Sequence, residues 1–558
     1  MRPLEQQEKS KILSTLDTLT ARKQVHAICV YGSQVAGYAR EDSDYDVIVA
    51  LSPFRQRIKY YYLKGEVDCS ALVVEAKSFE NDCLGSSLGE FVAGRLLNPY
   101  EGLVGKEFLK RNEVAFKRRV IIEGLADAYA DYQDFASEII FKLSYFLFEK
   151  LKKRASIYPP VVYSYSQTYG ENLISDNLRN SLEGFRSATE LLCSEGIVSY
   201  DPPDDSVRLA SASQTKHFRG GISAKLSVAA AYTTKSIRQY AVHGYAGRVS
   251  PTVVGKEVIS KFSRTRSHIK LPEAIRSPRN GGRWSLPEGR LFAESGNDWI
   301  GDLMEYFGLE SGDSKVIQKP MGEIYTASSF YTLEDSLHRH EIAVKRFRDI
   351  KAVKWGILNI WALKNADFAV NSMMRLYREY HAIKEFRRFG LYTPEVIAVF
   401  LLQEMLVTRF IKGKDLSKLQ TEYLNEELDD TVPFRNFGSI LATVHNNDYC
   451  IGDSKPSNAL LSDSDSKIYL VDLEQSHPNG NPSWDIAEFI YYSVRFTMKE
   501  ERARQLVSAF ISGYVDKSED SSVVEKACAL RYRAPFQAFI APNVLGAVLK
   551  DLKANSRK

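Results

Sequence analysis

At residues 32–49 the chain reads GSQVAGYAREDSDYDVIV, the stretch that decides the fold of the N-terminal part. It follows a predicted strand over residues 26–31 and runs into an apolar strand over residues 47–51. Asp44 and Asp46 are two residues apart, so strand geometry places both carboxylates on one face. Two like charges on one face are costly unless a cation lies between them, and Mg²⁺ prefers such oxygen ligands.

Gly32 and Ser33 are suited to binding a phosphate group. A glycine lets the backbone approach a phosphate closely, and the serine hydroxyl can donate a hydrogen bond to it. A strand, a Gly-Ser turn and paired aspartates are the parts needed for metal-assisted, in-line transfer of a nucleotidyl group. The alternative is a solvated turn before a strand. The spacing between Gly32 and the aspartates favours the nucleotide site.

This stretch resembles the nucleotidyltransferase motif of the DNA polymerase beta superfamily, and it is most similar to the minimal nucleotidyltransferase type. The resemblance covers about eighteen residues specifically. It implies that Asp44 and Asp46 hold the metal and that Gly32 and Ser33 bind the triphosphate of an NTP. We expect a nucleotidyltransferase domain with a mixed sheet over residues 1–103.

The superfamily often supplies a third carboxylate from a later strand. In the segment GEVDCSALVV, residues 65–74, the best candidate is Asp68, with Glu66 behind it. Catalysis by this domain requires one of these side chains to point into the site.

The next two segments are expected to be mainly helical. Residues 104–155 have apolar positions at helical spacing, and the pattern stops at Pro159-Pro160. Such helices often cover a nucleotidyltransferase sheet and help to define its acceptor pocket. Residues 156–210 combine a predicted helix over residues 173–195 with a hairpin signal over residues 196–209. This order is typical of a winged-helix module that binds nucleic acid, and also of a plain helical domain with a small hairpin.

The middle of the chain is strongly basic. The whole chain has 74 basic and 70 acidic side chains, a net charge of +4. Residues 211–290 alone contain 15 Lys or Arg against 3 Glu and no Asp, interleaved with aromatic residues. Basic side chains neutralise phosphates and aromatic rings stack on bases, so contact with tRNA or another RNA is one interpretation. The other is a basic connector over residues 211–300 that packs against the more acidic remainder.

From about residue 301 the chain presents a second set of phosphate-handling parts in order. Lys345 ends a short apolar strand, and a buried lysine there needs a partner such as Glu379 on a following helix. Further on come IGDSKPSN, residues 451–458, and a strand that ends in Asp472. Phosphoryl transfer uses such parts: a Lys–Glu pair for the phosphates, an Asp for the acceptor hydroxyl, and an Asn with a second Asp for Mg²⁺.

This order resembles the protein-kinase-like fold, and specifically the RIO kinases and the small kinase of the KEOPS tRNA-modification complex. The resemblance implies a bilobal serine/threonine-kinase-like domain over residues 301–558 that uses ATP and Mg²⁺. By residue it implies the following roles: Asp453 as catalytic Asp, Lys455 near the γ-phosphate, Asn458 and Asp472 as metal ligands, Lys345 with Glu379 as the phosphate-orienting pair, Gly322 in the nucleotide loop, and Asp485 as anchor of the catalytic loop.

Two departures from that pattern bear on nucleotide binding. Lys319 stands where a first loop glycine is expected, which leaves mainly Gly322 in the nucleotide loop. Glu474 stands where the flexible glycine after Asp472 would be. These changes predict a weaker grip on ATP or a more rigid loop.

Composition excludes several other classes. No apolar run approaches the roughly 20 residues that span a bilayer, and no signal-peptide core is visible, so we expect no membrane association. Six cysteines are scattered without a C-x-x-C pair, which suits a reducing cytoplasm. We therefore expect a cytoplasmic α+β multidomain protein.

Three functions fit these parts. In the first, the kinase phosphorylates a protein or RNA acceptor while the transferase adds a nucleotidyl group to a related target. In the second, the transferase nucleotidylates the kinase or its partner, as a self-regulating pair. In the third, the chain is a nucleic-acid-binding scaffold that uses ATP hydrolysis as a switch.

Overall fold

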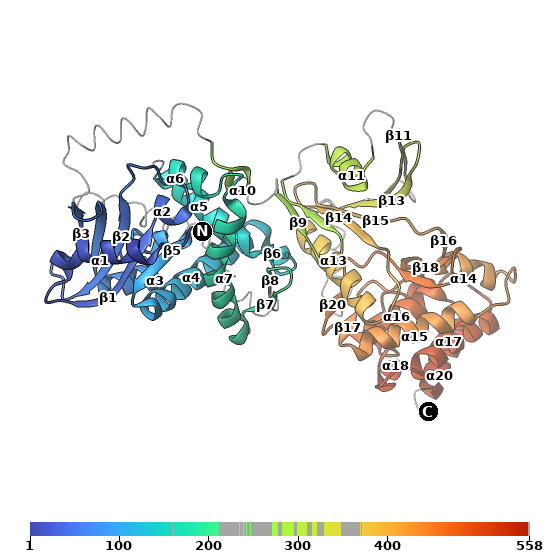
Figure 1. The fold of residues 1–558 in the computed structure, drawn as a ribbon. Coiled ribbons are helices and arrows are strands. Elements are labelled where there is room, and N and C mark those ends of the chain that lie inside the picture. Colours follow the sequence, from blue (N-terminus) through green and yellow to red (C-terminus); the bar gives the residue numbers. More distant parts are fainter. Residues whose placement is uncertain are drawn as a thin grey trace. The chain divides into compact units, whose positions relative to one another are not determined.

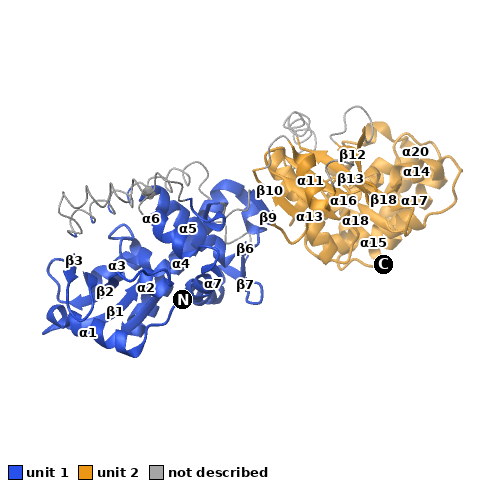
Figure 2. Cartoon of the chain, turned by 45° about the horizontal axis from the view of Figure 1, so that its top comes forward, with its two compact units in different colours: residues 1–284 blue, residues 285–558 orange. Residues whose placement is uncertain are grey.

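The computed structural model describes residues 1–158, 161–210, 270–276, 282–294, 298–309, 315–320, 328–347, 369 and 371–555, together with residues 234, 238, 242 and 246. The chain is a mixed α+β protein that divides into two compact units, residues 1–284 and residues 285–558 (Figure 2). Most of the basic segment 211–290, and Gly322 with it, lies outside the described residues.

A five-stranded sheet forms the first half of unit 1 (Figure 1), in the order β3-β4-β2-β1-β5. Strand β2 runs parallel to β4, whereas β1 is antiparallel to both β2 and β5. The strands are β1 (Gln24–Tyr31), β2 (Tyr45–Ser52), β3 (Ile58–Leu63), β4 (Cys69–Glu75) and β5 (Tyr100–Val104).

Alternation along β2 gives the two faces of this sheet different roles. Helix α1 (Gln6–Thr20) buries Ile12 and Leu16 against Val47 and Val49, which point to one face. Tyr45 joins the same core cluster, and its hydroxyl donates to Glu8 on α1. Because successive side chains alternate, Asp44 and Asp46 belong to the opposite face.

A helical block follows the sheet, as the apolar spacing predicts. Its helices are α3 (Ala76–Gly85), α4 (Lys106–Tyr132), α5 (Leu143–Ile157), α6 (Val161–Thr168) and α7 (Ile174–Ser194). The predicted hairpin forms as β7 (Val198–Asp201) and β8 (Ser206–Leu209), and β6 (Phe141–Lys142) adds a third strand to it. Residue 141 thus lies in a sheet with residue 207, so the expected segments 104–155 and 156–210 share one small sheet.

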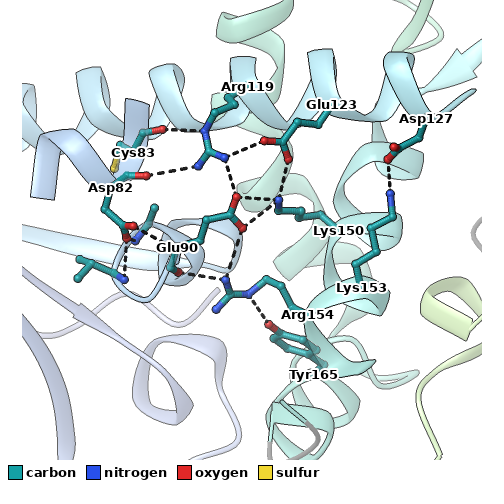
Figure 3. A network of polar contacts seen from close by, with 12 residues as sticks. Asp82, Cys83, Glu90, Arg119, Glu123, Asp127, Lys150, Lys153, Arg154 and Tyr165 are labelled. Atoms are coloured by element: carbon teal, nitrogen blue, oxygen red, sulfur yellow. Dashed lines mark hydrogen bonds and ion pairs between the residues drawn. The ribbon is translucent and has the colours of Figure 1, made fainter. Parts of the chain in front are cut away.

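A buried ionic network ties this block to the part of the chain that forms the five-stranded sheet (Figure 3). Glu90, in the loop between α3 and η1 (Ala93–Leu97), accepts ion pairs from Arg119 on α4 at 2.6 Å and Lys150 on α5 at 2.9 Å. Its backbone carbonyl accepts a hydrogen bond from Arg154 on α5 at 3.0 Å. Buried charges are tolerated only when paired in this way, so the network fixes the loop against both helices.

Unit 2 is bilobal. Its first lobe is built on a sheet of order β11-β12-β13-β15-β14-β10-β9. Residues 290–292, which the sequence predicts as part of the basic connector, form strand β10 of this sheet. The reason is that Leu291 and Phe292 are buried beside β14. The strands are β9 (Arg283–Ser285), β10 (Arg290–Phe292), β11 (Lys315–Pro320), β12 (Ser328–Glu334), β13 (Arg339–Arg346), β14 (Val396–Phe400) and β15 (Met405–Arg409).

The second lobe is mainly helical. Helix α15 (Val432–Asn446) packs on α17 (Glu500–Val515) through an aromatic cluster that includes Phe437, Phe489 and Phe510. Helices α13 (Ser372–Arg388) and α16 (Pro482–Ser493) carry functional side chains. Short strands β17 (Tyr449–Cys450) and β18 (Ala459–Ser462) flank the loop over residues 451–458, and β19 (Ile468–Leu470) pairs with β18.

None of the described helices combines the length and apolar character that crossing a membrane requires.

Candidate active sites

The first candidate site lies at the end of β1. Gly32 has a φ of +79° and precedes the short helix α2 (Ser33–Ala36). A Cβ at position 32 would lie 2.7 Å from Oδ2 of Asp46, so this position accepts only glycine without displacing the carboxylate. The structure therefore brings Gly32 and Asp46, which the sequence separates by fourteen residues, into direct contact.

Asp44 and Asp68 lie beside each other, each directly before one of the neighbouring strands β2 and β4. Tyr45 pairs with Cys69 in the parallel register of β2 and β4, and the amide of Tyr45 donates to the carbonyl of Asp68 at 2.9 Å. Both Asp44 and Asp68 are exposed, whereas Asp46 is half-buried.

Ser70 is the residue that sequence reasoning missed at this site. It pairs in register with Asp46, and its hydroxyl donates to Oδ2 of Asp44. The position facing the aspartates from within β4 thus holds a hydroxyl, and Asp68 stands just before the strand. Its place could have been found from the sequence by aligning the starts of β2 and β4.

The helical block holds the loop of this first site. Asn177 on α7 donates to the carbonyl of Ala36, and Tyr38 shares a hydrogen bond with Ser164 on α6 at 3.0 Å. Within the loop, Gln34 donates to the carbonyl of Ser43 at 2.9 Å. The residues between Gly32 and Asp44 are therefore fixed by side chains that come from far along the chain.

A cavity of about 300 Å³ opens between β5, α4 and α7. Tyr100 and Glu113 are among its lining residues, and the Tyr100 hydroxyl donates to Glu113 at 2.9 Å. Tyr100 pairs with Tyr31, the residue before Gly32, so the cavity lies at the same end of the sheet as the aspartates.

The second candidate site is centred on Lys345, near the end of β13. Its ammonium group makes ion pairs with Glu379 on α13 and with Asp472, and it lies 3.3 Å from Glu474. The three carboxylates come within 4.8 Å of one another, one of two such groups of possible ligands among the described residues. Residues from a strand, a helix and a distant loop thus meet at one point, although 127 positions separate Lys345 from Asp472.

The charges at this point shift each other's proton affinity. Burial disfavours the charged form of Lys345, but Asp472, Glu379 and Glu474 outweigh it and hold its pKa well above the ordinary value. Burial is also the main reason why the pKa of Glu379 rises to about 7; Lys345 opposes the rise, and Asp472 and Glu474 add to it. Lys345 is therefore a permanent cation in the folded chain.

The loop after β17 brings the other predicted residues together. The ammonium of Lys455 lies 2.6 Å from Oδ2 of Asp453, and burial opposed by Asp453 and Asp472 leaves the pKa of Lys455 raised. Asn458 donates through its side-chain amide to the carbonyl of Asp453 at 2.8 Å. The amide oxygen of Asn458 accepts from the hydroxyl of Ser457 at 3.4 Å, and its second lone pair can serve a metal ion.

Acidic side chains of helix α16 anchor that loop through hydrogen bonds. The predicted anchor Asp485 accepts hydrogen bonds from the amides of Ile451 at 2.7 Å and Gly452 at 2.9 Å. Glu488, one turn further along α16, accepts from the amide of Ser454 at 2.7 Å. Burial and the neighbouring Asp453 raise the pKa of Glu488 well above its usual range. Sequence reasoning did not single out Glu488, although its spacing from Asp485 places both on one face of α16.

The donor set of the second site fits Mg²⁺. Asp472 has a positive φ of 57° and a side chain that is 41% exposed, so its carboxylate is accessible at the end of the strand. With the oxygen of Asn458 it offers the hard oxygen ligands that Mg²⁺ takes together with substrate phosphates. When bound, the ion would neutralise phosphate charge during transfer.

Comparisons with known proteins agree with this division. Residues 14–76 match the family model described as polymerase beta, nucleotidyltransferase. The C-terminal part is similar to the EKC/KEOPS complex subunit bud32 of Dictyostelium discoideum, at 20% identity over 157 residues. That match covers 27% of this chain and 62% of the relative, so the chain spans less than two thirds of it.

Solved structures of kinase domains also match. Two structures of the PknI kinase domain of Mycobacterium tuberculosis, one of them a double mutant, are each 13% identical and cover 44% of this chain. The match covers 96% of the double-mutant chain and 98% of the other, with TM-scores of 0.24 and 0.22. The family match over residues 14–76 and the curated relative support a transferase, with a nucleotidyltransferase domain in the N-terminal part and a kinase-like C-terminal part.

Proposed function

We propose that the C-terminal unit is an ATP-dependent phosphotransferase of the RIO/KEOPS type that acts on serine or threonine hydroxyls or on RNA. The convergence of Lys345, Glu379 and Asp472 is the observation that carries this proposal. Lys345 would leave Asp472 for the α- and β-phosphates, while Glu379 keeps its ammonium in place. Asp472 and Asn458 would then hold Mg²⁺.

Asp453 and Lys455 would act on the transferred group. Asp453 accepts the proton of the acceptor hydroxyl as its oxygen attacks the γ-phosphorus, and ADP leaves. Lys455, already 2.6 Å from that carboxylate, would neutralise charge on the γ-phosphate. The hydrogen bonds that Asp485 accepts from the amides of Ile451 and Gly452 would keep the loop backbone fixed during the step.

We further propose that the N-terminal domain transfers a nucleotidyl group with Mg²⁺. Asp44 and Asp46 would hold the ion, the backbone at Gly32 and the hydroxyl of Ser33 would bind the triphosphate, and Asp68 would supply the third carboxylate. The family match over residues 14–76 favours this second activity. The cavity beside Tyr100 is the proposed place of its acceptor.

The acceptor of either site is proposed to be a protein or an RNA, in a cytoplasmic setting. The basic composition of residues 211–290 supports RNA by charge alone. The alternative is a self-regulating pair, in which one unit modifies the other. The labelled-ATP experiment below distinguishes this alternative by showing whether the label is transferred to the chain itself.

Labelled ATP tests both proposals on the full chain. Transfer of the γ-label that is lost in Asp453→Asn supports the phosphotransferase, and transfer of the α-label that is lost in Asp44→Asn supports nucleotidylation. The matched controls are Asp516→Asn and Asp17→Asn, which change exposed aspartates outside both sites. Release of phosphate without transfer of either label would contradict both and favour an ATPase switch.

A further inference from the structure

Glu474 is buried two residues after Asp472, at the place where the kinase-like pattern has a flexible glycine. One carboxylate oxygen lies 3.3 Å from the ammonium of Lys345 and 3.3 Å from the guanidinium of Arg375. The side chains of Arg375 and Glu474 are only 1% and 4% exposed. A charge at such depth needs its partner, because removing one member strands the other in a low-dielectric site.

Arg375 lies on the same face of α13 as Glu379. The two residues are four positions apart, which places one above the other on a helix. The ring of Phe347 lies 5.0 Å from the ammonium of Lys345 and 5.9 Å from the guanidinium of Arg375. The two cations that face Glu474 therefore lie over one aromatic ring.

The balance of charge indicates what Glu474 contributes. If Asp472 turns to a metal ion, Lys345 still faces Glu379 and Glu474, and Arg375 still faces Glu474. Without Glu474, Arg375 would compete with Lys345 for Glu379. Without Arg375, Glu474 would compete with the phosphates for Lys345.

A second contact fixes the same segment. The side chain of Gln475 accepts from the amide of Ala369 at 2.7 Å and donates to its carbonyl at 3.3 Å. Ala369 lies three residues before α13, so the chain after Asp472 is joined to this helix and to the residues that lead into it.

We propose that Arg375 and Glu474 are a positioning pair that reserves Glu379 for Lys345 and holds α13 and the Asp472 strand end in the nucleotide-binding arrangement. This inference rests on the proposed phosphotransferase function of the same site. On this proposal, Glu474 holds α13 and the strand end at Asp472 in place before a nucleotide binds. A glycine at position 474 would leave the strand end free to turn.

Calorimetric titration of the full chain with Mg²⁺ and the non-hydrolysable analogue AMP-PNP tests the pair. The variants are Glu474→Gln, Arg375→Leu and the double variant Arg375→Leu with Glu474→Leu. We expect each single variant to bind the analogue about tenfold more weakly, and the double variant to recover to within about threefold of wild type, because it removes both competing charges. In steady-state assays the single variants should raise KM for ATP more than they lower kcat.

The control is Arg504→Leu. Arg504 on α17 pairs with Asp551 on α20 (Pro542–Asn555), so this variant also breaks an arginine–carboxylate pair of unit 2. It should lower Tm and leave the affinity for AMP-PNP unchanged.

Three results would overturn the pair. Single variants that lose Tm but bind the analogue like wild type would show a purely structural role. A double variant as weak as the weaker single variant would show that Glu474 acts directly on the nucleotide or metal. Wild type that binds the analogue but transfers no γ-phosphate would remove the proposed function alone, since the pair is still judged by binding. Wild type that binds no nucleotide would overturn both.

Discussion

The two candidate sites differ in how their charged side chains are arranged. In unit 2 the protein supplies its own cations, and Lys345 and Lys455 already lie against carboxylates. In unit 1 Asp44 is exposed and accepts a hydrogen bond from Ser70, and Asp46 rests against Gly32. The candidate site of unit 2 is held by ion pairs within the chain, whereas in the candidate site of unit 1 Asp44 is held by the hydroxyl of Ser70.

The largest effect that would sharpen this comparison is expected from Lys345→Met. The change removes the cation around which three carboxylates gather, so γ-phosphate transfer should fall by about 100-fold or more. Transfer of the α-label should not change, because unit 1 has its own site. Loss of both activities would contradict the independence of the two sites. The measurement is kcat/KM for each label, with Lys414→Met, an exposed lysine paired with Glu422, as control.

Gly32→Ala is expected to have the next largest effect. The new Cβ would meet the Asp46 carboxylate at 2.7 Å, and the φ of +79° is unfavourable for alanine. Displacing the carboxylate that is proposed to bind the metal by a fraction of an ångström should lower α-label transfer by about 10- to 100-fold. Gly196→Ala, with a φ of +70° and open space around it, is the matched control for backbone strain. An equal loss in both variants would argue against the contact with Asp46.

Stability should depend on pH through Glu379. Its pKa is raised to about 7, above the ordinary value of 4.5, so between these values the folded chain binds a proton that the unfolded chain has released. Stability from this group is therefore present at low pH and falls as the pH rises towards 7. The Tm of wild type minus the Tm of Glu379→Gln should therefore decrease from pH 5 to pH 8. Each kcal/mol of stability that wild type loses over this range should lower that difference by about 2–4 °C.

Calorimetry in EDTA measures this difference without interference from metal ions. Glu385→Gln, a change at a neighbouring glutamate of α13 that pairs with Arg388, should show no such pH trend. A difference in Tm that stays constant with pH would rule out the raised pKa.

The smallest effect is expected from Ser70→Ala. The variant removes the hydroxyl that holds Asp44, and a hydrogen bond to a charged group contributes about 1.5–3 kcal/mol at most. Because Asp44 is exposed and water can replace the hydroxyl, we expect a decrease of only a few-fold in α-label transfer and a higher Mg²⁺ requirement. Titration with Mg²⁺ measures both. A loss as large as that of Asp44→Asn would show that Ser70 has a more direct role.

Local patterns predicted much of the fold because they depend on neighbouring residues. The strand before Gly32, the helix over residues 173–195 and the hairpin after it all form. The small sheet of β6 with β8 was not predictable, because a two-residue strand has no period of its own. Residues 290–292 were assigned to a connector for their basic surroundings, whereas their burial depends on β14, a hundred positions later.

The sites show the same limit. Motif order placed Lys345, Glu379, Asp453 and Asp472 on the correct kinds of element, and Asp485 reaches the loop that it was expected to anchor. Arg375 could not be chosen from the sequence, since its importance lies in what it faces, whereas Ser70 could be found only by aligning the starts of β2 and β4. Glu474 was visible only as a departure from a pattern, and its partners became clear from the packing of α13.

The ionic network around Glu90 has a consequence for how this protein can be divided or recombined. Arg119, Lys150 and Arg154 come from two helices and end on one loop of the sheet. A fragment that stops near residue 103 would expose the loop and leave Glu90 without these cations. The helical block is therefore not an exchangeable attachment: a gene that acquired the sheet without residues up to Arg154 would keep the loop that Asp82 holds through backbone amides, but would leave the carboxylate of Glu90 without its cations.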